Sequence, residues 1–195
     1  MGSRECEYCG VRFQPTNARG RTPRFCSNAC KQAAYRDRQV LPVELRTRDR
    51  WVMWKLASRG GLPTKVPIQP TGKAASSTDA ATWSPWSRVR PAARKGFVLG
   101  AGIGCLDLDH CLIDGLLTPA AARFLAQLPP TYIEVSPSGD GLHVWGRMPE
   151  GRGRRYVTGD GLRVEHYSVG RYITVTERPA PGSVRRLADL SEVVS

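Results

Sequence analysis

The chain has 195 residues, of which 29 are Lys or Arg and 17 are Asp or Glu, so the formal net charge is +12. Hydrophobic residues make up 41% and charged residues 24%, an ordinary globular composition that argues against general disorder. No run approaches the roughly 18–20 apolar residues of a membrane span. The opening MGSRECEYCG lacks the apolar core of a secretory signal. We therefore expect a cytoplasmic protein without a membrane partner, and the charge favours binding to nucleic acid.

Four of the six cysteines form two close pairs near the N-terminus, Cys6 with Cys9 and Cys26 with Cys30. Two such pairs separated by a loop are typical of a tetrahedral zinc site, in which each pair holds one side of the ion. Because four thiolates leave no open coordination position, we predict a structural Zn²⁺ rather than a catalytic one. The FCSNAC stretch resembles small treble-clef-like or FCS-type zinc fingers.

The predicted zinc module is rich in basic side chains, and we expect a short basic helix from residue 30 to residue 38. Either the zinc ion only stabilises the module, or the basic side chains form a face that contacts nucleic-acid phosphates. The second interpretation involves Arg12, Arg19, Arg21, Arg24, Lys31, Arg36 and Arg38.

Changes in composition divide the chain into a four-cysteine zinc-finger module (1–40), a polar linker (41–50), a larger domain (51–180) and an amphipathic tail (181–195). The larger domain reads as short β-like runs between Gly and Pro residues, at 51–56, 96–109, 131–136, 142–148, 162–168 and 171–177. One helix is expected at 118–128, with Thr118 as N-cap and Pro119 as its first residue, and a shorter one at 84–93. Strands with few helices predict an α+β fold.

Apolar and acidic residues alternate in CLDLDHC, residues 105–111. Because side chains on a strand alternate between its two faces, Asp107 and Asp109 should share one face about 7 Å apart. Two carboxylates at that spacing repel each other unless a divalent cation lies between them, and Mg²⁺ or Mn²⁺ suits such oxygen ligands. The alternative is that these acids only cap the loop after the strand.

Two later segments add chemistry to this pair. In SPSGDGLHVWG (136–146) a Ser/Gly turn leads into a strand, so Ser136, Ser138 and His143 could hold phosphate oxygens. In RVEHY (163–167) Glu165 lies mid-strand, where a buried carboxylate is costly without a cation. The alternatives are a core histidine with satisfied hydrogen bonds and a surface pair of Glu165 with Arg163 or another basic residue.

The order of these segments resembles the archaeo-eukaryotic primase superfamily, and in particular the primase-polymerase (prim-pol) domains of phages and plasmids. The resemblance covers nearly all of residues 50–178. It also includes WVMWK (51–55), TKVP (64–67), TGKAASSTDAATWS (71–84), GFVLG (96–100), EVSPSGDGLHVWG (134–146) and EHYSVGRYITVTE (165–177).

The resemblance implies a prim-pol catalytic domain with a mixed sheet, which performs template-directed nucleotidyl transfer by two-metal catalysis. It assigns Mg²⁺ or Mn²⁺ to Asp107, Asp109 and Glu165. It also places the triphosphate of an NTP or dNTP at His143, Ser136 and Ser138, with Lys65 and Arg171 as further phosphate contacts. A single-stranded DNA template and the cytoplasm of a bacterial host follow from the same resemblance. Full-length prim-pol proteins often continue into a helicase or a helical priming region, so two alternatives stay open: a stand-alone minimal enzyme, or one that works with a separately encoded replicative helicase.

Two other functions use the same residues. A metal-dependent nuclease would need the same carboxylates, although the Ser/Gly turn and His143 suit a triphosphate better than an activated water. A non-catalytic zinc-finger nucleic-acid-binding protein with a degenerate primase fold is the second alternative, although a decayed site need not keep all three acids and the histidine.

Overall fold

A computed structural model describes the chain except residues 1–2, 8, 16–21, 38–39 and 194–195. Arg19, Arg21 and Arg38 therefore lie outside the described residues, as does the side chain of Arg36. The chain divides into two compact units, Met1–Val40 and Leu41–Ser195. No helix in the described part of the chain has the length and apolar character needed to cross a membrane.

The smaller unit contains a two-stranded antiparallel sheet, β1 (Arg4–Glu5) and β2 (Arg12–Phe13), and one helix, α1 (Asn28–Asp37). Gly10 has a φ of +72° in the turn between the strands and donates its N–H to the carbonyl of Cys6 at 3.0 Å. The helix starts two residues earlier than expected, because the Ser27 hydroxyl accepts the N–H of Cys30 at 3.1 Å and caps its first turn.

The larger unit begins at Leu41, so the expected linker at 41–50 is part of it. This segment forms α2 (Val43–Arg46), in which Leu45 is fully buried. The carbonyl of Leu45 accepts the indole N–H of Trp51 at 3.0 Å, and Arg50 donates to the carbonyls of residues 98 and 99. Charged residues in RTRDR suggested an exposed connection, but the contacts of Leu45 and Arg50 hold it against the sheet.

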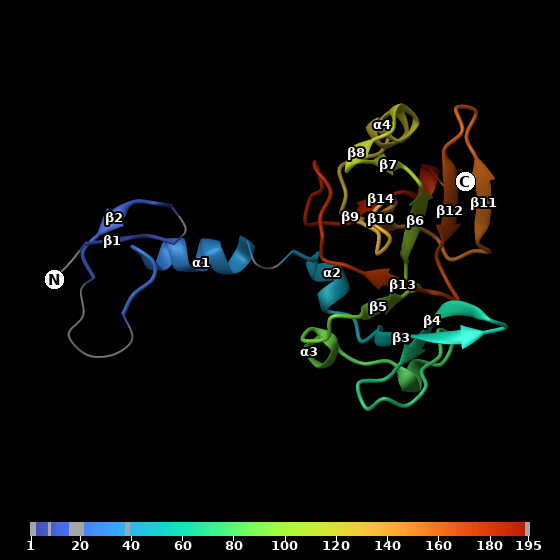
Figure 1. Ribbon diagram of the computed structural model, residues 1–195, viewed down its shortest axis with the longest axis horizontal. Helices are drawn as coiled ribbons and strands as arrows, with labels where there is room; N and C mark the ends of the chain where they lie inside the picture. The colour runs from blue at the N-terminus through green and yellow to red at the C-terminus, as the bar shows by residue number, and fades with distance from the viewer. Residues whose placement is uncertain (1–2, 8, 16–21, 38–39, 194–195) are drawn as a thin grey trace. The chain divides into compact units, whose positions relative to one another are not determined.

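One antiparallel sheet has the strand order β13 (Tyr172–Val175), β5 (Lys95–Val98), β3 (Trp51–Arg59) and β4 (Leu62–Ile68) (Figure 1). The sequence did not reveal β4, because Pro63 and Pro67 interrupt its pattern. Proline is tolerated here because β4 is an edge strand. One side of its backbone pairs with no neighbouring strand, so a missing N–H on that side costs the sheet no hydrogen bond. Near this sheet lie the short helices η1 (Ala80–Thr82) and α3 (Trp86–Val89), the latter inside the helix expected at 84–93 and ending before Pro91.

The second sheet is mixed, as predicted for the fold. Its order is β11 (Arg154–Val157), β12 (Arg163–Tyr167), β6 (Ile103–Asp109), β10 (Leu142–Arg147) and β14 (Ala188–Asp189), with β9 (Ile133–Val135) also paired to β10. Among the described strand pairs of this sheet, β10 with β14 is parallel and the others are antiparallel. The exposed edge strand β11 has no apolar alternation, so the sequence did not indicate it.

One face of the mixed sheet carries the hydrophobic core. Leu106, Leu108 and Leu142 point into it together with Ala121 of α4 (Pro119–Ala126). The helix has the predicted start, because the Thr118 hydroxyl accepts the N–H of Ala121 at 3.3 Å. A small hairpin, β7 (Leu112–Ile113) and β8 (Leu116–Leu117), connects β6 to this helix (Figure 1).

The expected amphipathic tail also contributes to the core. Leu187 and Leu190 are buried, and η2 (Ser191–Val193) follows β14. On the opposite face of the mixed sheet, the Trp145 ring meets Phe97 of the other sheet edge-to-face at 6.1 Å. The two sheets therefore meet on the face opposite α4, which is the face that carries Asp107.

Candidate functional site

Five polar residues form a row across five neighbouring strands of the mixed sheet. His143 and Glu165 lie directly opposite Asp107 on its two sides, Glu134 lies opposite His143, and Arg155 lies opposite Glu165. Residues directly opposite each other share a face of the sheet, so all five point away from the core that α4 covers. The alternation of β6, in which Leu106 and Leu108 point into the core, places Asp107 and Asp109 on this same face.

Asp107 lies at the centre of this row and is 25% exposed at its side chain. Burial raises the pKa of Asp107. The neighbouring His143 lowers it, while Asp109 and Glu165 raise it. A charged Asp107 is therefore unfavourable in the protein alone, and a cation beside it would remove that cost. The chemistry of this donor set fits a hard divalent ion.

Glu165 is held away from a closed cluster with the other acids. Its Oε1 forms an ion pair with Nε of Arg155 at 2.8 Å, and its Oε2 accepts from the hydroxyl of Tyr167 at 2.6 Å. Among the described residues, three or more side chains able to bind a metal lie closely together in one group, the four cysteines near the N-terminus. The acidic residues of the row do not form such a group. The carboxylates thus share a face, but Glu165 is engaged by Arg155 and Tyr167.

A cleft of about 360 Å³ opens on the Asp107 side of the row, between the two sheets. It brings together four of the expected site residues, Asp107, His143, Lys65 and Arg171. Ser77 and Tyr172 also line the cleft. The Tyr172 hydroxyl donates to the carbonyl of Lys65 at 2.8 Å, which joins the walls of the cleft. The cleft therefore combines one carboxylate with three groups able to contact an anion.

His143 is held by a carboxylate that the sequence did not bring to notice. Glu134 is fully buried, and its Oε1 lies 3.4 Å from Nδ1 of His143. The same oxygen accepts the indole N–H of Trp145 at 3.3 Å. Nε2 of His143 lies 3.7 Å from Oδ1 of Asp107. The ring thus lies between two carboxylates, with Nε2 on the Asp107 side.

The second oxygen of Glu134 ties the row to the other sheet. It accepts the backbone N–H groups of Thr176 and Glu177, at 3.1 and 2.9 Å, and the hydroxyl of Tyr132 at 3.1 Å. Five donors therefore surround one buried carboxylate. The sequence signal for Glu134 was an acidic residue between apolar neighbours in TYIEVS, which is the same signal that pointed to Glu165.

The Ser/Gly turn lies beside the cleft and does not line it. The hydroxyls of Ser136 and Ser138 are 2.8 Å apart, and Ser138 also donates to the carboxylate of Asp140. The other oxygen of that carboxylate lies 2.6 Å from Nδ1 of His110. The serine hydroxyls thus form a hydrogen-bonded chain that leads to His110 and not to His143.

The four cysteines of the smaller unit meet in one cluster. Their sulfur atoms lie within 4.8 Å of one another, with Cys26 at 3.4 Å from Cys30 and 3.6 Å from Cys9. Tetrahedral Zn–S bonds of about 2.3 Å would hold sulfur atoms about 3.8 Å apart, so the cluster has the right size. Hydrogen bonds with the sulfurs of Cys30 and Cys9 raise the pKa of Cys26 to about 12. A cation is needed to stabilise four thiolates here.

Known proteins show which family this arrangement belongs to. The family model for the N-terminal domain of bifunctional DNA primase/polymerase (Prim-Pol) matches residues 29–190. The chain belongs to this family. It is also similar to the DNA primase-polymerase of Nitratiruptor phage NrS-1, at 36% identity over 139 residues. That match covers 65% of this chain and 19% of the phage protein, so the chain spans about a fifth of that relative.

The prim-pol match covers the whole polar row and both sheets of the larger unit. It begins at residue 29, inside α1, and therefore leaves Cys6, Cys9 and Cys26 outside the matched span. Sequence reasoning found Asp107, His143 and the two basic residues of the cleft. It missed Glu134, Arg155, Ser77 and Tyr172, whose places in the site depend on strand register and on contacts between the sheets.

Proposed function

We propose that this prim-pol chain is a template-directed nucleotidyltransferase that makes or extends strands on single-stranded DNA, using NTPs or dNTPs. The observation that carries this proposal is the cleft in which Asp107 faces His143, Lys65 and Arg171. A nucleotide triphosphate needs both kinds of group, carboxylates for its divalent cations and positive side chains for its phosphates.

The chain's own residues divide this work. Asp107 and Asp109 would hold divalent metal with Glu165 on the next strand. Such metals lower the energy of the charged transition state at the α-phosphate. Lys65 and Arg171 neutralise the β- and γ-phosphates, while Nε2 of His143 faces the same cleft as a hydrogen-bonding group. Glu134 holds the ring of His143 in this orientation.

The reaction forms one P–O bond and breaks another. The 3′-hydroxyl oxygen of the strand attacks the α-phosphorus, and the bond to the bridging oxygen of pyrophosphate breaks. The hydroxyl proton passes to solvent, and no protein nucleophile is needed. Positive groups on the triphosphate side stabilise the pyrophosphate as it leaves.

For the smaller unit we propose a structural Zn²⁺ held by Cys6, Cys9, Cys26 and Cys30. The size of the sulfur cluster supports this assignment. Basic side chains of the unit, among them Arg12 and Lys31, would contact the template. The similarity to a phage enzyme supports a role in phage or mobile-element replication in the cytoplasm of a bacterial host.

A strand-synthesis assay tests the proposal. Purified protein receives single-stranded DNA, with and without a primer, labelled NTPs or dNTPs, and Mg²⁺ or Mn²⁺. The test variant carries Asp107→Asn and Asp109→Asn. The matched control carries Asp114→Asn, in an exposed turn where the residue has a φ of +50°, which asparagine also adopts.

We expect labelled products from the wild type and the control, and none from the double variant. A wild type that only shortens the DNA would show a nuclease. If all three proteins bind DNA and none makes product, the chain is a binding module, and the proposal is wrong.

A further inference from the structure

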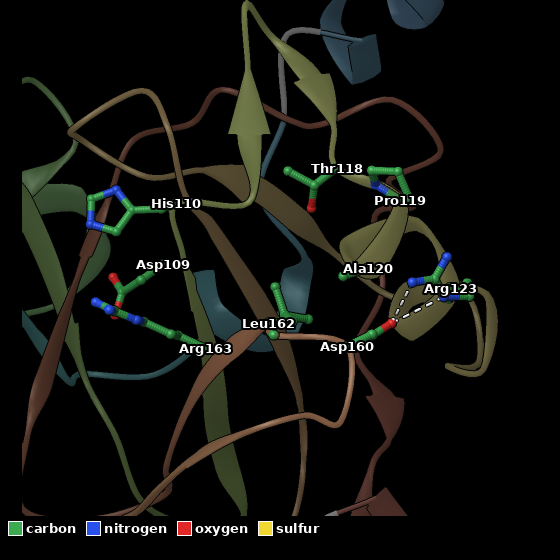
Figure 2. A pocket seen from close by; sticks show the side chains of 10 residues that line it. Asp109, His110, Thr118, Pro119, Ala120, Arg123, Asp160, Leu162 and Arg163 are labelled. Atoms are coloured by element: carbon green, nitrogen blue, oxygen red, sulfur yellow. Dashed lines mark hydrogen bonds and ion pairs between the residues drawn. The ribbon is translucent and has the colours of Figure 1, made fainter.

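A second cavity, of about 550 Å³, lies beyond Asp109 at the end of β6 (Figure 2). One end is formed by Asp109, His110 and Arg163, and the other by Thr118, Arg123 and Asp160 beside the start of α4. The acidic pair thus lies between two cavities, because Asp107 lines the first and Asp109 lines the second.

The basic groups of this cavity are not equally available. Arg123 donates two hydrogen bonds to Asp160, at 3.0 and 2.7 Å, and is occupied by that carboxylate. Arg163 lies opposite Asp109 in the strand register, and its side chain points toward Asp109 in Figure 2. Arg163 is exposed and forms no ion pair with any described carboxylate. It is therefore a cation available to a ligand.

His110 is oriented for the same cavity. Its Nδ1 is fixed by Asp140, at the end of the hydrogen-bonded chain from Ser136 and Ser138. Nε2 has no hydrogen-bond partner in the described part of the chain. His110 also has a φ of +49°, an uncommon conformation for a residue with a side chain. The Ser/Gly turn thus positions His110 at the edge of the second cavity.

In-line transfer gives this cavity a place in the reaction. The attacking oxygen and the leaving oxygen lie on opposite sides of the phosphorus. If the triphosphate occupies the Asp107 cleft, as proposed above, the strand that supplies the 3′-hydroxyl arrives from the Asp109 side. The groups available there are Arg163 and His110, which suit a phosphate.

We propose that the second cavity binds a phosphate of the nucleotide that supplies the 3′-hydroxyl, through Arg163 and His110. This inference rests on the proposed function and adds the residues that position the acceptor. The phosphate has two possible sources with shared chemistry, a phosphodiester of a primer strand or the triphosphate of a first nucleotide.

The first test measures binding and needs no catalysis. A fluorescent primer annealed to a template is titrated with full-length protein by anisotropy, at several salt concentrations and without added divalent metal. Variants are Arg163→Gln, the charge-preserving Arg163→Lys, and Arg88→Gln as a matched control. Arg88 is exposed and lies on α3, outside the residues that line either cavity.

We expect Arg163→Gln to weaken binding about tenfold, which corresponds to about 1.4 kcal/mol for one lost charged contact. The slope of the logarithm of the association constant against the logarithm of the salt concentration should become less steep by about 0.9, which corresponds to the loss of one phosphate contact. Arg163→Lys should retain the slope, and Arg88→Gln should match the wild type. An unchanged affinity and slope in Arg163→Gln would exclude the primer strand as the source of the phosphate, and unchanged unprimed synthesis in the same variant would then overturn the proposal.

The second test measures KM in strand synthesis. Arg163→Gln should raise KM for the primed template about tenfold and change KM for the incoming nucleotide less than about twofold. A larger effect on the incoming nucleotide would place Arg163 in the first site and refute the assignment. A defect confined to unprimed synthesis would identify the first nucleotide's triphosphate as the ligand, and a defect in both reactions a strand phosphate.

The binding test also separates this inference from the proposed function. A wild type that makes no strand, yet binds DNA through Arg163 with the expected salt dependence, would contradict the enzyme and retain the phosphate site.

Discussion

Replacement of Glu134 by glutamine tests whether a buried carboxylate organises the site. Glutamine has the same size but only one acceptor oxygen, whereas Glu134 accepts from five donors. The backbone N–H groups of Thr176 and Glu177 cannot rotate, so the remaining oxygen must face them. The new NH₂ group then faces Trp145 and His143.

The magnitude follows from what each donor loses. The indole N–H of the fully buried Trp145 would have no acceptor, and an unsatisfied buried donor costs about 1–3 kcal/mol. His143 would lose its charged partner at Nδ1, so its ring is held less firmly in the cleft. We therefore expect the free energy of unfolding to fall by about 1–3 kcal/mol. KM for the incoming nucleotide should rise about tenfold, which is about 1.4 kcal/mol.

Urea unfolding and steady-state kinetics measure the two effects. Glu192→Gln is the matched control, since Glu192 is exposed and should leave both quantities unchanged. A Glu134→Gln protein with wild-type stability and wild-type KM would refute the reasoning. Lower stability with unchanged KM would show that Glu134 supports the fold and does not position His143.

Three further predictions concern other parts of the chain. Without divalent metal, Asp107→Asn should raise the free energy of unfolding at pH 7, because burial raises the pKa of Asp107 and its ionised form opposes folding. This gain in stability should shrink as the pH falls, because the wild-type carboxyl then becomes protonated. Urea unfolding at several pH values measures it. Cys26→Ser should lower bound zinc, measured by atomic absorption, and unfold the smaller unit while the thermal transition of the larger unit persists. Leu45→Ala should cost about 2–5 kcal/mol in urea unfolding of the larger unit, whereas an exposed linker would lose almost nothing.

The strands with apolar alternation could be predicted from the sequence, and so could the start of α4. Leu106 and Leu108 alternate with the two aspartates, and a period of two fixes which side chains share a face. Thr118 and Pro119 carry local information about a helix start. These signals act within a few residues, so one sequence is enough to read them.

The features that were missed depend on long-range contacts. Edge strands β4 and β11 lack the apolar pattern of buried strands, because only one side of an edge strand is paired. Residues 41–50 look polar, but Leu45 is buried and Arg50 finds its partners 48 and 49 residues away along the chain. Glu134 acquires its place beside His143 only through the pairing of β9 with β10.

A crystal structure with Mn²⁺ and a non-hydrolysable nucleoside triphosphate tests the central claim most directly. We predict anomalous manganese density at Asp107 and Asp109, with the triphosphate against Lys65, Arg171 and His143 in the cleft of about 360 Å³. A triphosphate bound elsewhere, or manganese absent from the acidic pair while the nucleotide is bound, would contradict the proposed site of nucleotidyl transfer.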